Sequence, residues 1–312
     1  MLHASGISHS QFRVTDVTEQ LKPEQKESDN FKFQIVYLVP ILASLLFGLV
    51  CAYLLMPQQS EAIPVTPIPE STPGAPLGNA LYFVVLVAIS ATMFYFLLKR
   101  KSKNIIKGLI VVALTMASLL LSVVYLSAIL VYVPFLDNLW VLIALSVALS
   151  VLFDLAIFRF GSIARNVAVV AIGGALGIFF GFSIPLYSAV AILAFLGIYD
   201  VFAVYKGPVG KIAASGLDQL QGLSFSFKDI QMGLGDLVFY SMLTGVIFFG
   251  FPTNILPTIM AIIGILAGSI ITFFALEKKG IFPGLPFPIL LGLGAGLIVA
   301  LLLGLPFPTS VV

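Results

Sequence analysis

The sequence predicts an all-α membrane protein with nine transmembrane helices. Its 312 residues are 60% apolar and only 10% charged, with a mean hydropathy of +1.11. Because soluble domains carry about 25% charged residues, this composition excludes soluble enzymes and disordered chains. The net charge of +2 is too small to indicate a nucleic-acid partner. Two further observations, the apolar segments and the basic residues, complete the prediction.

The first is a series of apolar segments of membrane-spanning length. About 20 helical residues cross the hydrocarbon core, since a helix rises about 1.5 Å per residue. The nine segments are 33–56, 80–98, 105–133, 139–158, 166–182, 185–205, 231–250, 255–276 and 285–304. Residues 1–31 are polar and predict a disordered tail, not a signal peptide. We therefore expect a tail, a transmembrane domain over 32–305 and a short C-terminal tail over 306–312.

The second observation is the placement of lysine and arginine, which are enriched in cytoplasmic loops. All 16 lie in the first tail or near the connections that follow even-numbered segments: 13–32, 99–107, 159–165, 206–228 and 278–279. The pattern predicts a cytoplasmic N-terminus and an extracytoplasmic C-terminus. We expect a multi-pass integral protein in contact with membrane lipid, in the cell membrane of a prokaryote or an endomembrane of a eukaryote.

Small residues at four-residue spacing predict close contacts between helices. They fall in segments five, eight and nine: Gly173, Gly177, Gly181, Gly264, Gly268, Gly292 and Gly296. These residues indicate a compact helical bundle but no chemistry.

Three acidic residues lie within apolar segments, where a charge is costly and a functional role is the default hypothesis. Asp154 is the weakest candidate, because it lies five residues before Arg159 near a segment end. We expect an interfacial partner or a structural hydrogen bond there. The other two residues are Asp200 and Asp236.

Topology makes Asp200 and Asp236 a pair. Asp200 lies six residues before Lys206, about 9 Å of helix, and Asp236 lies eight residues after Lys228, about 12 Å if that stretch is helical. On antiparallel neighbours the two carboxyls reach similar depth and should share one proton. An aspartic protease uses this state to activate water and polarise a carbonyl. From spacing alone, proton or cation transport fits equally well, and a structural hydrogen bond also remains open.

Three local motifs favour one of these alternatives. The chain reads Tyr199-Asp200 in segment six, Gly233-Leu234-Gly235-Asp236 in segment seven, and Pro283-Gly284-Leu285-Pro286 before segment nine. It resembles the GxGD intramembrane aspartyl proteases, the presenilin and signal peptide peptidase family. That family carries YD and GxGD on helices six and seven of nine, and Pro-Ala-Leu before helix nine. Gly284 replaces the family's alanine, and the predicted orientation resembles the presenilin branch.

The resemblance implies an aspartic endopeptidase whose catalytic part covers about 185–305, with Asp200 and Asp236 catalytic. Its substrates would be transmembrane-helix proteins, either single-span proteins or signal-peptide remnants. No cofactor or metal is expected, and HExxH is absent from the sequence. Because the connection over 206–230 is short, accessory subunits are not expected to be required. The sequence does not indicate the oligomeric state. The alternative is a proton- or cation-coupled transporter or channel that uses the same acids.

The motif residues suggest physical roles. Gly233 and Gly235 would let a substrate or a neighbouring helix approach the Asp236 backbone, although plain helix packing also explains them. Tyr199 would donate a hydrogen bond near Asp200 or be only a satisfied aromatic residue. Prolines 283, 286 and 288 should leave carbonyl groups without helical partners, because proline has no N–H.

A substrate helix must unwind before water reaches its peptide bonds, so an extended substrate needs a binding strand. Leu223 to Lys228 alternates apolar and polar residues, which predicts a short strand that includes Ser224, Phe225, Ser226 and Phe227. We hypothesise that it pairs with substrate, opposite the Pro283 to Pro286 loop. An amphipathic interfacial connection is the alternative.

Overall fold

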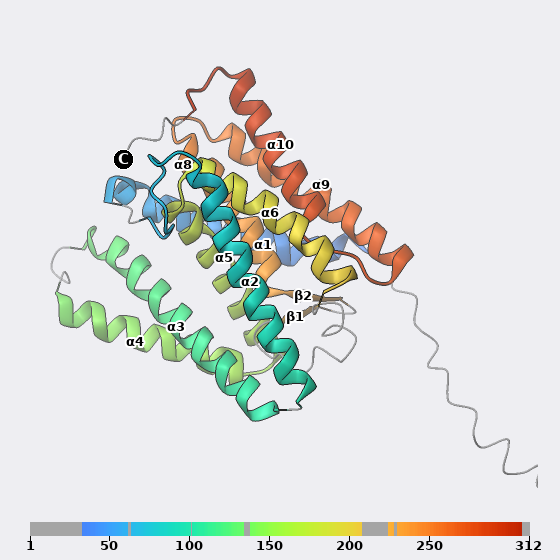
Figure 1. The fold of residues 1–312 in the computed structure, drawn as a ribbon. Helices are drawn as coiled ribbons and strands as arrows, with labels where there is room; N and C mark the ends of the chain where they lie inside the picture. Colours follow the sequence, from blue (N-terminus) through green and yellow to red (C-terminus); the bar gives the residue numbers. More distant parts are fainter. Residues whose placement is uncertain are drawn as a thin grey trace, which may run out of the picture. The chain divides into compact units, whose positions relative to one another are not determined.

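A computed structural model describes residues 33–61, 64–100, 102–133, 138–207, 224–227 and 230–307 of the chain (Figure 1). The predicted tail over 1–31 and residues 308–312 of the C-terminal tail lie outside these residues. Leu223 and Lys228, the ends of the predicted strand, also lie outside them.

Nine α-helices occupy the nine predicted segments within the described ranges. They are α1 (Val39–Leu55), α2 (Ala75–Lys99), α3 (Lys103–Leu130), α4 (Leu139–Phe158), α5 (Ser162–Ser183), α6 (Leu186–Tyr205), α8 (Leu234–Gly250), α9 (Leu256–Lys279) and α10 (Pro286–Leu302). Two 3-10 helices, η2 (Ile35–Leu38) and η3 (Met56–Glu61), flank α1. Seven spans are long and apolar enough to cross a membrane, and α8 and α10 are apolar helices of 17 residues. The predicted all-α membrane architecture is confirmed, and the orientation of the termini stays a prediction.

Helix α8 begins later than the sequence predicts. Strand β1 (Ser224–Phe227) pairs antiparallel with β2 (Ile230–Gly233), with Ser224 opposite Gly233. The predicted strand over 224–227 is therefore confirmed. The expectation that segment seven is helical from 231 is wrong, because strand pairing takes residues 230–233. Asp236 consequently lies in the first turn of α8.

Helices α5 and α8 pack at backbone distance, as the predicted glycine stripe requires. A Cβ placed on Gly177 would lie 2.7 Å from the backbone nitrogen of Met242, and one on Gly181 would lie 2.7 Å from that of Val246. Because either contact is too close for a real side chain, only glycine permits this approach. The stripe thereby fixes the position of α8, the helix that carries Asp236.

Helices α9 and α10 lie side by side and make a second contact of this kind (Figure 1). A Cβ placed on Gly268 would lie 2.5 Å from the Cα atom of Pro288, and one on Gly292 would lie 2.7 Å from the side chain of Ile265. The predicted small-residue contacts in these segments are confirmed. They hold the first turn of α10 against α9.

The connection between α1 and α2 is tied to α6 by buried polar groups. The Asn79 side chain accepts the Ile68 N–H at 3.0 Å and donates to the Ile68 carbonyl at 2.9 Å. It also donates to the Ser188 hydroxyl at 2.9 Å, and that hydroxyl donates to a Glu70 carboxyl oxygen. These bonds attach the first residues of α2 to the first turn of α6.

Candidate active site

Asp200 lies near the end of α6 and faces the loop that joins α9 to α10. Its Oδ2 accepts a hydrogen bond from the backbone N–H of Leu285 at 3.0 Å. The backbone of Gly284 also lies close to this carboxyl group. The loop docks on α6 one turn earlier as well, where a Cβ on Gly197 would lie 3.8 Å from the Cα of Pro286.

Asp236 approaches the same loop from α8. A Cβ placed on Gly284 would lie 3.0 Å from Asp236 Oδ2 and 3.1 Å from Oδ1. The Asp236 carboxyl lies beside the backbone of Gly233 and close enough to Asp200 for electrostatic interaction. A carboxyl in the first turn also interacts favourably with the helix dipole. Two acids that are distant in sequence therefore meet at the peptide between Gly284 and Leu285.

Glycine and proline determine the backbone conformation of the α9–α10 loop, residues 280–285. Gly280 ends α9 with a φ of +73°, a conformation that L side chains rarely adopt. Helix α10 then begins at Pro286, and its first backbone bond joins the Ile289 N–H to the Leu285 carbonyl. Pro288 has no N–H to give the Gly284 carbonyl, so this carbonyl needs another donor.

That donor is the hydroxyl group of Tyr240, which lies 2.8 Å from the Gly284 carbonyl oxygen. Tyr240 is only 2% exposed and follows Asp236 by one helical turn. The loop prolines predict a carbonyl without a helical partner, but the sequence does not identify Tyr240 as its donor. The signal was the four-residue spacing, which places two side chains on the same face of a helix.

The two glycines before Asp236 are open to their surroundings. A Cβ placed on either Gly233 or Gly235 would have no neighbour closer than 3.9 Å. The alternative of plain helix packing therefore does not explain them. By contrast, Leu234 is 8% exposed, and its Cδ1 would lie 3.3 Å from a Cβ on Gly173. Within this motif, the leucine packs against α5 and the glycines leave space beside the acid.

Tyr199 and the loop prolines take different positions around the pair. Tyr199 is partly buried and interacts electrostatically with Asp200. The hydrogen-bond donor that the described residues give Asp200 is the backbone N–H of Leu285. Pro283 is buried and Pro286 partly buried. The motif residues of α6, α8 and the α9–α10 loop are thus assembled in one place, and their catalytic roles stay predictions.

Asp154 lies in a polar seam between α3 and α4. Its Oδ2 accepts a hydrogen bond from the Thr115 hydroxyl at 2.7 Å. One turn away, the hydroxyls of Ser118 and Ser150 are 2.8 Å apart. The predicted structural hydrogen bond is confirmed, and Asp154 is thereby distinguished from the pair on α6 and α8.

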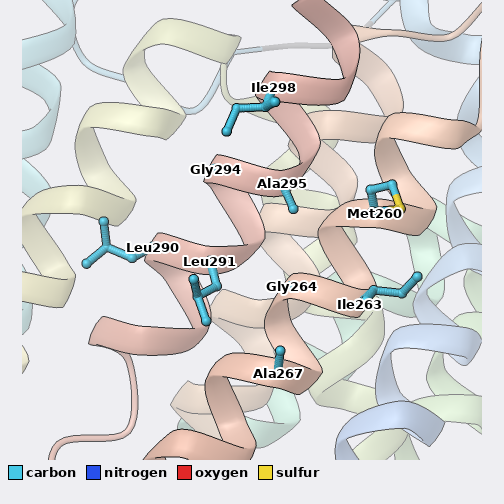
Figure 2. Close-up of a pocket in the computed structure, with 9 residues that line it drawn as sticks. All are labelled: Met260, Ile263, Gly264, Ala267, Leu290, Leu291, Gly294, Ala295 and Ile298. Atoms are coloured by element: carbon cyan, nitrogen blue, oxygen red, sulfur yellow. The ribbon is translucent and has the colours of Figure 1, made fainter. Parts of the chain in front are cut away.

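A groove of about 270 Å³ lies between α9 and α10, and its lining residues carry no polar or ionisable side chain (Figure 2). Gly264 and Gly294 lie along it, and Leu290 and Ile298 are among the apolar side chains around it. Within the described ranges, no cluster of three or more His, Cys, Asp or Glu residues is arranged to hold a metal ion. The converging carboxyls therefore define the candidate active site.

No protein-family model matches the chain, and no curated protein matches its sequence. Its fold, however, is similar to solved structures. Two crystal structures, each of a presenilin family intramembrane aspartate protease, were determined in space groups C222 and P2. The first aligns with a TM-score of 0.61 at 20% sequence identity and covers 85% of this chain and 98% of the other. The second aligns with a TM-score of 0.60 at 21% identity and covers 85% and 97%.

The chain therefore has the fold of the presenilin family of intramembrane aspartate proteases. Its seven apolar spans of full length and the two shorter apolar helices make it an integral membrane protein. At this identity the likeness establishes the fold, and the activity has to be argued from the site.

Proposed function

We propose that the chain is an intramembrane aspartyl endopeptidase of the GxGD type. The observation that supports this proposal is the convergence of Asp200 and Asp236 on the Gly284–Leu285 peptide. Two adjacent carboxyls that share one proton supply both a base and an acid. The reaction needs no cofactor.

In the proposed reaction, a water molecule lies between the two carboxyls and the scissile carbonyl. The ionised aspartate accepts a proton from the water as its oxygen attacks the carbonyl carbon. The protonated aspartate donates a hydrogen bond to the carbonyl oxygen and stabilises the developing charge. Proton donation to the amide nitrogen then breaks the C–N bond and releases an amine and a carboxylic acid. Both aspartates are required, since each has a separate role.

The first experiment measures cleavage of a single-span reporter by the purified chain in liposomes. Asp200→Asn and Asp236→Asn should each lower the rate about 100-fold or more, because each removes a group that transfers a proton. Asp154→Asn is the matched control, since it changes a third intramembrane acid that accepts its bond from Thr115. Loss of cleavage in the control alone, or retention in either test variant, would refute the assignment. Activity of the purified chain would also support independence from accessory subunits.

The alternative function, a transporter or channel, predicts a different result with the same preparations. Proton or cation flux across the liposome membrane should then depend on Asp200 and Asp236 while the reporter stays intact. A hydroxyl-containing peptide isostere, which mimics the tetrahedral intermediate, should bind tightly only to a protease. The α6–α8 site is proposed as a protease because the fold it lies in is that of intramembrane aspartate proteases.

We further propose that substrates are single-span proteins or signal-peptide remnants, held in extended form by β1. The strand leaves one edge unpaired among the described residues, and its partner β2 runs directly into α8. An added strand can use such an edge. N–H groups alternate between the two edges, so Phe225→Pro and Ser226→Pro remove donors from opposite sides. Both variants should lose cleavage of the reporter but still fold. Full activity in both would remove the strand from the mechanism.

The proposed orientation places the N-terminus in the cytoplasm. The lysine and arginine distribution supports it. Single cysteines introduced at position 10 and position 310 of a Cys51→Ala chain would be labelled with a membrane-impermeant maleimide in intact cells. The C-terminal cysteine should react and the N-terminal one should not; the reverse pattern would invert the topology.

A further inference from the structure

The peptide unit between Gly284 and Leu285 is held from both sides. Its carbonyl oxygen accepts the Tyr240 hydroxyl at 2.8 Å, and its N–H donates to Asp200 Oδ2 at 3.0 Å. The chain has no cis peptide bond among the described residues, so this unit is trans and its C=O and N–H point in opposite directions. Tyr240 on α8 and Asp200 on α6 therefore hydrogen bond to opposite sides of one planar peptide unit.

The geometry points to Tyr240 as the positioning residue of the active site, an inference that rests on the proposed protease function. Through this peptide, its hydroxyl fixes where the Leu285 N–H presents itself to Asp200. A donor at the carbonyl also polarises the peptide, which strengthens the N–H as a donor on the other side. Tyr240 thus acts on Asp200 without direct hydrogen bonding to it.

The environment of Tyr240 fits this role. The phenol is 2% exposed and lies near both Asp200 and Asp236. The nearby Ser269 hydroxyl on α9 donates to the Ile265 carbonyl of its own helix, so the single Tyr240 proton is left to the Gly284 carbonyl. Because the side chain is enclosed, its hydroxyl has little freedom to leave the Gly284 carbonyl. The hydrogen bond consequently holds the α9–α10 loop at a fixed position relative to α8, the helix that carries Asp236.

The position of Pro288 explains why the Gly284 carbonyl needs the Tyr240 hydroxyl as a donor. A residue with an N–H at position 288 would satisfy the Gly284 carbonyl within α10, but Pro288 leaves it free. An unpaired carbonyl at this depth is costly. The hydrogen bond from Tyr240 to the Gly284 carbonyl, here called the clamp, therefore pairs a carbonyl that the start of α10 leaves without a donor. It also makes the position of the loop depend on α8.

The test is Tyr240→Phe, which removes the hydroxyl and keeps the ring. Its matched control is Tyr125→Phe, because the Tyr125 hydroxyl on α3 donates to the Ala175 carbonyl on α5, also at 2.8 Å. The two substitutions delete the same kind of bond, but only one lies at the aspartate pair. Both should lower the melting temperature to a similar extent.

In the reporter assay, Tyr240→Phe should lower kcat about tenfold, the effect of one ordinary hydrogen bond, with KM changed less than about twofold. Tyr125→Phe should leave kcat unchanged. An equal kcat for the two variants would overturn the inference, because the hydroxyl would then contribute only to folding.

A second measurement does not depend on catalysis. Hydrogen exchange of segment 281–287, followed by mass spectrometry, reports chiefly on a few amides, because Pro283 and Pro286 have no N–H. Exchange should accelerate in Tyr240→Phe and stay unchanged in Tyr125→Phe, since only the first releases the Leu285 amide. Unchanged exchange in Tyr240→Phe would refute the clamp even if the chain cleaves reporters. Accelerated exchange in a chain that cleaves none would retain the clamp and reject the protease.

Discussion

Two regions of the molecule place carboxyl groups inside the membrane, and these carboxyls accept their hydrogen bonds from different kinds of donor. On α4, Asp154 accepts a bond from a side chain of the neighbouring helix, Thr115, only 39 residues away. On α6, Asp200 accepts its bond from the backbone of a loop 85 residues away. A second acid, Asp236, faces the same loop. The structural acid thus takes its hydrogen bond from within a helical hairpin, whereas the candidate catalytic pair depends on the long-range placement of one peptide.

This difference indicates where small changes should have large effects. Any shift of the α9–α10 loop alters the surroundings of both Asp200 and Asp236. A shift of α3 against α4 alters only the hydroxyl bonds between two helices that share one edge of the bundle (Figure 1). The following substitutions test this contrast, beginning with the one that should matter most.

The largest effect is expected at Gly284. The added methyl groups of Gly284→Val would lie against the Asp236 carboxyl, because even a Cβ would approach to 3.0 Å. Cleavage should fall about 100-fold, as expected when reacting groups are misplaced by about 1 Å. Gly284→Ala should cost less, since the end of the Asp236 side chain has to give way by only a few tenths of an ångström.

The control for Gly284→Ala is Gly294→Ala on α10. A Cβ on Gly294 would meet no atom within 4 Å, and alanine favours helix more than glycine. Reporter cleavage by the two variants should therefore diverge. Equal rates for Gly284→Ala and Gly294→Ala, together with full activity of Gly284→Val, would show that the contact with Asp236 does not constrain the reaction.

A smaller effect, on stability, is expected at Gly177 in α5. Gly177→Ala places a Cβ 2.5 Å from Ser241 Cβ and 2.7 Å from the Met242 backbone nitrogen. Overpacking of this kind should lower the free energy of unfolding by about 1–3 kcal/mol, read as a lower melting temperature in detergent. Gly108→Ala on α3 is the control, because a Cβ there would meet nothing within 4 Å. A melting temperature as high as that of the control would contradict the packing argument.

The sequence predicted all that depended on composition and local pattern. Apolar length identified the nine helices, and depth along antiparallel neighbours paired Asp200 with Asp236. Strand β2 was missed because Ile230-Gln231-Met232 continues into an apolar run, and only pairing with β1 makes it extended. Tyr240 was missed for a similar reason. It is one of ten tyrosines, and its role depends on a carbonyl that lies 44 residues later in the chain.

The smallest effect is expected in the polar seam, where Thr115→Val removes the donor to Asp154 without changing side-chain volume. The loss of one inter-helix bond should lower the free energy of unfolding by about 1–2 kcal/mol, because the carboxyl keeps its place but loses its partner. Thr92→Val on α2 is the control, since the Thr92 hydroxyl bonds only to the Ala88 carbonyl of its own helix. Reporter cleavage per folded molecule should be unchanged in both variants. A fall in kcat for Thr115→Val at equal folded fraction would mean that the seam communicates with the aspartate pair, and the two acid sites would then no longer be independent.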